Sequence, residues 1–123
     1  MNYRRKDTTD KSLKLCNNSC VICGWHKMDY KGNSLVEGAH IRDYSDAPEI
    51  DDYKNIIALC PNHHREFDAG NFYIDPDTRI VYFYDDDEYN YENISSRIKY
   101  VDKRYLIYKK SKIEEMRKAS QRG

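Results

Sequence analysis

The sequence has no long hydrophobic run and no excess of charge of either sign. No stretch of its 123 residues approaches the roughly 18 consecutive apolar residues that a membrane-spanning helix needs. No apolar segment follows the basic first residues in the manner of a secretion signal. Internal repeats and low-complexity segments are also absent. These absences exclude an integral membrane protein, and we expect a soluble, intracellular protein that has no contact with membranes.

Apolar residues are scarce for a chain of this length. Hydrophobic residues make up 39% of the sequence, and the mean hydropathy is -0.99. A single domain over residues 1–123 would therefore have a thin core. A bound metal ion would help such a chain to fold.

The formal net charge of zero hides a pattern along the chain. Residues 1–27 carry a net charge of +4, residues 28–95 carry -11, and residues 96–123 carry +7. The basic ends could grip phosphates on either side of a central site, or they could be ordinary solvated faces. The candidate nucleic-acid contacts are Arg4, Arg5, Lys109, Lys110 and Lys112.

Hydrophobic periodicity and turn residues predict a strand, a second strand and a helix in succession. The first strand covers residues 35–41 and ends near His40, the second covers residues 56–59, and the helix covers residues 62–68. Pro61 suits the first turn of this helix, and Gly70 suits its end. These elements predict an α+β fold.

The flanking segments are expected to add to this core. Residues 1–15 predict a basic N-terminal arm, flexible over residues 1–9, with a short helical turn from Asp10. Residues 72–84 predict a β-hairpin that completes the sheet. Residues 96–120 predict a basic C-terminal helix, which is amphipathic from about residue 102.

Two half-sites with the spacing of metal ligands lie about forty residues apart. Cys20 and Cys23 form a C-x2-C pair, and Cys60 and His63 form a C-x2-H pair. Zn2+ takes four thiolate or imidazole ligands in closed structural sites, which contribute on the order of 10 kcal/mol or more to folding. Disulfides, or cysteines that are simply buried, are the weaker alternatives, because two matching half-sites rarely arise together. Cys16 lies outside both pairs, and we expect it to be a free, packed thiol.

His40 and His64 are left over once the four zinc ligands are assigned. A neutral histidine can take a proton from water, or it can lend a ring nitrogen to a metal. A lone histidine is usually structural. The combination of both histidines with Asn55 and the two half-sites favours a functional centre.

Three segments resemble the HNH nuclease family. They are residues 36–41 (VEGAHI), residues 55–64 (NIIALCPNHH) and residues 67–70 (FDAG). The closer resemblance is to the branch found in modification-dependent and other restriction endonucleases, and it covers about residues 20–83. It implies a ββα-metal (HNH) fold with a structural zinc site, in which residues 20–84 form the ββα-metal core and an added β-hairpin, followed by a C-terminal helix.

The resemblance also implies roles for individual residues. His40 matches the general base that activates water, and Asn55 matches the asparagine that fixes the loop and orients that histidine. His64 matches a ligand of the catalytic cation. The zinc ligands match Cys20, Cys23, Cys60 and His63, with a histidine where many members have a second cysteine.

One position departs from the family pattern. Many members place an aspartate ligand directly before the first histidine, and this chain has Ala39 there. Asp68, four residues after His64, could reach the same ion, or it could make a hydrogen bond at the end of the helix. Glu37 is the poorer candidate, because alternation along the strand places it on the face opposite His40. The catalytic cation would be Mg2+, or another divalent ion such as Mn2+, Co2+ or Ni2+.

The resemblance therefore implies a metal-dependent endonuclease that hydrolyses phosphodiester bonds of double-stranded DNA. A restriction or phage-type nuclease, acting in the cytoplasm of a bacterium, is the expected setting. The alternative is a non-catalytic, zinc-stapled nucleic-acid-binding module. RNA or branched substrates, nicking or paired cutting, and a homodimer all stay open.

Overall fold

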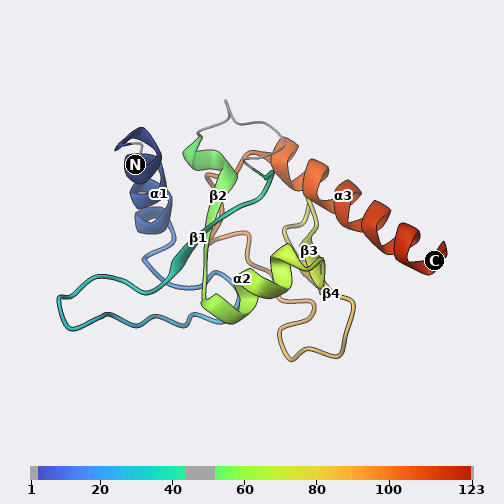
Figure 1. Cartoon of the computed structure of the whole chain (residues 1–123), viewed down its shortest axis with the longest axis horizontal. Coiled ribbons are helices and arrows are strands. Elements are labelled where there is room, and N and C mark those ends of the chain that lie inside the picture. The colour runs from blue at the N-terminus through green and yellow to red at the C-terminus, as the bar shows by residue number, and fades with distance from the viewer. Residues whose placement is uncertain (1–2, 44–51, 123) are drawn as a thin grey trace.

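A computed structural model of the protein describes residues 3–43 and 52–122, apart from the side chains of residues 3–6 and 122. In chain order its elements are α1 (Tyr3–Leu15), β1 (Glu37–His40), the 3-10 turn η1 (Tyr53–Asn55), β2 (Ile56–Leu59), α2 (Pro61–Asp68), β3 (Phe72–Ile74), β4 (Val81–Phe83) and α3 (Lys103–Arg122). The predicted α+β fold is confirmed, and Figure 1 shows the β1–β2 hairpin between α1 and α2.

The first hairpin and α2 form the predicted strand, strand and helix. β1 pairs antiparallel with β2, so that Glu37 lies opposite Leu59 and His40 lies opposite Ile56. All four residues of β2 are buried, as its apolar sequence predicts. α2 begins at once after β2, with Pro61 in its first turn. The end of β2 therefore fixes where the helix starts relative to β1.

The N-terminal segment is a helix, and the predicted flexible arm is wrong. α1 contacts β1, β2 and η1. Its Ser12 hydroxyl donates a hydrogen bond of 2.7 Å to the carbonyl oxygen of Tyr53. A Cβ atom on Gly38 would lie only 2.6 Å from Cγ2 of Thr9, so the absence of a side chain at Gly38 lets α1 approach the hairpin. These tertiary contacts stabilise a helix whose own sequence shows no clear apolar face.

The second hairpin forms a separate sheet, which corrects the prediction that it completes the first one. β3 pairs only with β4 among the described strands, with Phe72 opposite Phe83. The rings of Phe67 and Phe72 lie 5.1 Å apart and those of Phe72 and Phe83 lie 4.7 Å apart. The hairpin thus packs through aromatic side chains against α2 instead of extending the sheet.

The C-terminal helix begins at Lys103, so the predicted start at residue 96 is wrong. Asp102 accepts a hydrogen bond of 2.9 Å from the backbone N–H of Arg104, as a residue at the start of a helix does. α3 packs against β3. Its buried residues are Tyr105, Leu106, Lys109 and Ile113. Among the described helices, none combines the length and apolar character that a membrane span requires.

Candidate functional site

Three cysteines and one histidine meet where the turn at residues 20–24 contacts the start of α2. Gly24 has a φ of +77°, and its N–H donates to the carbonyl oxygen of Cys20 at 2.8 Å. This tight turn brings Cys20 and Cys23 to the same side. Cys60 caps α2, and its sulfur accepts from the backbone N–H of His63 at 3.4 Å. The strand-to-helix junction therefore presents both ligands of the second half-site.

The four ligand atoms fit a tetrahedral ion. All lie within 4.8 Å of one another. Nδ1 of His63 is 3.7 Å from Sγ of Cys20 and 3.3 Å from Sγ of Cys60, and the sulfurs of Cys23 and Cys60 are 4.0 Å apart. Ligand atoms on a zinc ion with bonds of about 2.0–2.3 Å lie about 3.3–3.8 Å apart in a tetrahedron. The cluster could thus hold a structural ion with little rearrangement.

The outer nitrogen of His63 faces carboxylates. Nε2 lies 3.9 Å from Oε2 of Glu66, and Asp87 lies in the same group of acceptors. Carboxylates at this position keep the proton on Nε2, which leaves Nδ1 free to bind a metal. Nothing in the local sequence pairs Asp87 with His63, and the sequence analysis missed both carboxylates.

The electrostatics of the cluster favour thiolate character at one cysteine. Burial opposes ionisation of Cys20, but hydrogen bonds from His63 and from nearby backbone N–H groups lower the pKa of its thiol to about 6. Burial raises the pKa of the Cys23 thiol to about 12. Metal binding would remove the remaining thiol protons, because a metal takes thiolate ligands.

Asn55 anchors the segment that follows His40. Its side chain is 0% exposed. Its Oδ1 accepts from the N–H of Arg42 at 2.8 Å, and its Nδ2 donates to the carbonyl oxygen of Arg42 at 3.0 Å. Its own carbonyl oxygen accepts from the N–H of Ile41 at 2.9 Å. One buried asparagine therefore fixes the backbone of the two residues directly after His40, the last residue of β1.

His64 lies between two carboxylates on the surface of α2 that faces β1. Its Nδ1 is 2.8 Å from Oε1 of Glu37, and its Nε2 is 3.4 Å from Oδ2 of Asp68. The His64 side chain is 25% exposed, and the carboxylates are more open than that. The three side chains form a half-open group in which each carboxylate contacts a different nitrogen of the imidazole ring.

The contact of Glu37 with His64 was not expected from the sequence, which ranked Glu37 only as a poorer candidate for a metal ligand. Alternation does place Glu37 on the face opposite His40, but the same alternation places it on the face of Ala39. The face of Ala39 is the one on which the resemblance expects a carboxylate ligand. The pairing of β1 with β2 then brings Glu37 beside the first turns of α2, which local sequence does not reveal.

The predicted nucleic-acid contacts occupy different environments. Lys109 is 6% exposed, with its ammonium 4.5 Å from the centre of the Phe67 ring, which argues against contact with a phosphate. Lys110 lies 3.6 Å from Glu114, and Lys112 lies 3.3 Å from Asp43. Arg4 and Arg5 lie in α1, and their side chains fall outside the described part of the structure.

Comparison with known proteins finds a family that the central part of the chain resembles. Residues 20–75 match a protein family described as HNH endonuclease. The matched region contains the Cys3His cluster, His40, Asn55 and His64. Residues 20–75, called the HNH region below, are thus similar to the HNH endonuclease family over just under half of the chain. No match was found among curated proteins.

The HNH region also has a counterpart among solved structures. The chain resembles a structure described as a modification dependent TagI restriction endonuclease, with a TM-score of 0.64 and 22% sequence identity. The match covers 86% of this chain but only 37% of that one. At this identity the likeness shows a shared fold, and with 86% of the chain covered it extends beyond residues 20–75.

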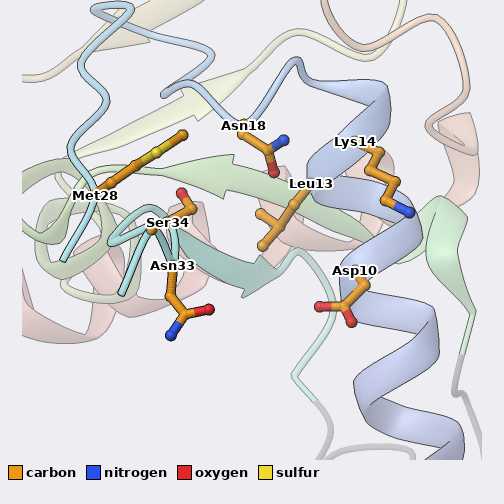
Figure 2. A pocket seen from close by; sticks show the side chains of 8 residues that line it. Asp10, Leu13, Lys14, Asn18, Met28, Asn33 and Ser34 are labelled. Carbon is orange, nitrogen blue, oxygen red and sulfur yellow. The ribbon is translucent and has the colours of Figure 1, made fainter. Parts of the chain in front are cut away.

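The predicted site residues do not line the cavity between α1 and the loop at residues 28–34. A cavity of about 390 Å³ opens between α1 and the loop at residues 28–34. Figure 2 shows Leu13 and Asn18 on one side of it and Met28 and Ser34 on the other. The lining residues include none of the predicted site residues, so this cavity is not the candidate HNH site, which lies at the open surface between β1 and α2.

Proposed function

We propose that this protein is a metal-dependent endonuclease that hydrolyses phosphodiester bonds in DNA. The observation that carries the proposal is the arrangement inside the HNH region. His40 ends β1 on a backbone anchored by Asn55. His64, on the helix that follows the same hairpin, lies between a carboxylate of β1 and a carboxylate of α2. A base and a cation-binding group therefore stand on one rigid ββα unit.

His40 is the proposed general base. A neutral imidazole accepts a proton near pH 7, which is the requirement for activating a water molecule. Asn55 supports this role indirectly, because its two side-chain hydrogen bonds fix the backbone just after His40. A small change in the position of the base would move the water out of line with the phosphorus atom.

His64 and Asp68 are the proposed protein ligands of the catalytic cation. Mg2+ or Mn2+ is the expected ion, and a nitrogen ligand also admits Co2+ or Ni2+. Bound there, a divalent cation would neutralise the charge that develops on the phosphate and on the leaving oxygen. Zn2+ is the proposed occupant of the Cys20, Cys23, Cys60 and His63 cluster, where it would hold the turn at residues 20–24 to the start of α2.

Double-stranded DNA is the proposed substrate. The proposed phosphate contacts are Lys110 and Lys112 on α3 and Arg4 and Arg5 on α1. Lys109 is left out because it is buried. The structural neighbour is a modification-dependent restriction enzyme, so methylated DNA belongs in the substrate panel. A homodimer is part of the proposal, because two copies of the site would allow paired cuts in the two strands.

The test is incubation of zinc-loaded protein with supercoiled plasmid in Mg2+, Mn2+, Co2+ or Ni2+, with EDTA as the control. Nicked or linear plasmid in at least one metal is expected, and none with EDTA. His40→Ala, with its zinc content and DNA binding verified, should cut at least about 100-fold more slowly. Binding without cleavage in every metal would instead identify a zinc-stapled nucleic-acid-binding module, the role that Ala39 favours. Undiminished cutting by His40→Ala would refute the assignment of the base.

A further inference from the structure

Glu37 is joined to α2 by the pairing of the first hairpin. In the register of β1 and β2, Glu37 lies opposite Leu59, the last residue of β2. Cys60 and α2 follow directly, so the Glu37 side chain lies beside the first turns of the helix. There Oε1 of Glu37 is 2.8 Å from Nδ1 of His64, although the two residues are 27 positions apart in the chain.

The two carboxylates near His64 contact different ring nitrogens. Glu37 lies at Nδ1, and Asp68 lies at Nε2. An ionised carboxylate can only accept hydrogen bonds, so the short contact with Glu37 requires the proton on Nδ1. In a neutral imidazole the lone pair is then on Nε2, the nitrogen that faces Asp68.

The distances from the two ring nitrogens of His64 distinguish a hydrogen bond at Nδ1 from a shared cation site at Nε2. The Nδ1 to Oε1 separation of 2.8 Å is the length of a charge-assisted hydrogen bond. The Nε2 to Oδ2 separation of 3.4 Å is too long for a good hydrogen bond. It is close to the roughly 3.0 Å between neighbouring ligands of an octahedral ion with bonds of about 2.1 Å.

We propose that Glu37 is a positioning residue for the catalytic cation site. Its carboxylate accepts the Nδ1 proton of His64, fixes the ring and its tautomer, and directs Nε2 toward the ion that Asp68 also binds. Glu37 thus lies on the same face of β1 as Ala39, but it acts through His64 and does not replace the carboxylate ligand that many family members have at that position. This inference rests on the proposed function, since it concerns the same cation.

The competing arrangement makes Glu37 a direct ligand. A direct ligand needs its negative charge, whereas a hydrogen-bond acceptor needs only an oxygen in the right place. Glu37→Gln separates the two roles, because the amide oxygen still accepts a hydrogen bond from Nδ1 but, being uncharged, binds a cation more weakly than a carboxylate does. Glu115→Gln on α3 is a matched control, since Glu115 is also exposed and lies far along the chain from this group.

The test is titration of zinc-loaded protein with Mn2+ alone, followed by calorimetry, without DNA. Glu37→Ala should weaken Mn2+ binding about 10- to 100-fold, as loss of a partner behind a ligating histidine does. Glu37→Gln should lose less than about fivefold, because a neutral acceptor makes a weaker version of the same hydrogen bond. Glu115→Gln should bind as the wild type does. In 15N-labelled protein, the Nδ1–H tautomer of His64 should persist in Glu37→Gln and be lost in Glu37→Ala.

Three results would overturn the inference. Equal, large losses in Glu37→Gln and Glu37→Ala would make Glu37 a direct ligand. Unchanged Mn2+ binding in Glu37→Ala would make the contact with His64 irrelevant to the ion, and wild-type protein that binds no Mn2+ would remove the site. Failure of the proposed function looks different: protein that shows the expected Mn2+ series but never cuts DNA retains the role of Glu37 and loses the nuclease assignment.

Discussion

Replacement of Asn55 by alanine should damage activity much more than folding. Asn55 is 0% exposed, and its side chain satisfies both the N–H and the carbonyl oxygen of Arg42. Removing it leaves two backbone groups without partners, at about 1–3 kcal/mol for each buried polar group. Arg42 is half-buried, so water can reach part of this segment, and we expect a total loss of about 2–4 kcal/mol.

A domain with an ordinary stability of about 5–15 kcal/mol would stay folded after that loss. Urea unfolding of the zinc-loaded protein, followed by far-ultraviolet circular dichroism, measures the change. Asn62→Ala is the matched control, because Asn62 is exposed on α2, and its replacement should change the free energy of unfolding by less than about 0.5 kcal/mol.

The effect on cleavage should be larger than the effect on folding. The backbone after His40 loses its anchor in Asn55→Ala, and a shift of about 1 Å in a reacting group can cost about 100-fold in rate. The two substitutions should not add, so Asn55→Ala should slow a His40→Ala protein little further. An Asn55→Ala protein that unfolds like the wild type and cuts at the wild-type rate would refute this account of the site.

Three further predictions concern the metal cluster and the flanking helices. Cys60→Ala should bind less than one equivalent of zinc and lose cooperative unfolding, because the ion joins two segments of a thin core; zinc analysis and thermal scans check this. Gly38→Ala should cost about 1–3 kcal/mol through the clash with Thr9, and Thr9→Ala should restore part of it in the double variant. The side-chain hydrogen bond from Arg104 lowers the pKa of Asp102 to about 2. The stabilisation from the ionised Asp102 is therefore present above about pH 4 and is lost as the pH falls toward 2. In Arg104→Ala, NMR titration of the carboxyl groups should show the pKa of Asp102 rising toward its ordinary value.

The central unit was predictable because its signals are local. The four buried apolar residues of Ile56–Leu59 mark a strand. Pro61, two residues later, and Gly70, about two turns after that, mark the start and end of a short helix. Both hairpins were also expected. That the second forms its own sheet depends on aromatic packing of Phe72 with Phe67 and Phe83, which strand periodicity does not contain.

The flanking helices were less predictable because their signals are tertiary. α1 depends on the missing side chain at Gly38 and on the hydrogen bond that its own Ser12 donates to Tyr53. Gly38 and Tyr53 are both far from α1 in the sequence. Lys109 looked like a surface cation from its charge. Its place on the buried face of α3, with the ammonium over the Phe67 ring, is decided by how that helix packs.

The sequence by itself determined the chemical groups and their order along the chain. The spacing of Cys20, Cys23, Cys60 and His63 named four candidate metal ligands, since pairs of cysteine and histidine at this spacing are typical of zinc sites. Helical spacing already placed Asp68 near His64, and only the tertiary structure decided that Glu37 accompanies them. Strand register sets that choice, because pairing Glu37 with Leu59 brings β1 beside α2 and places Glu37 at Nδ1 of the histidine.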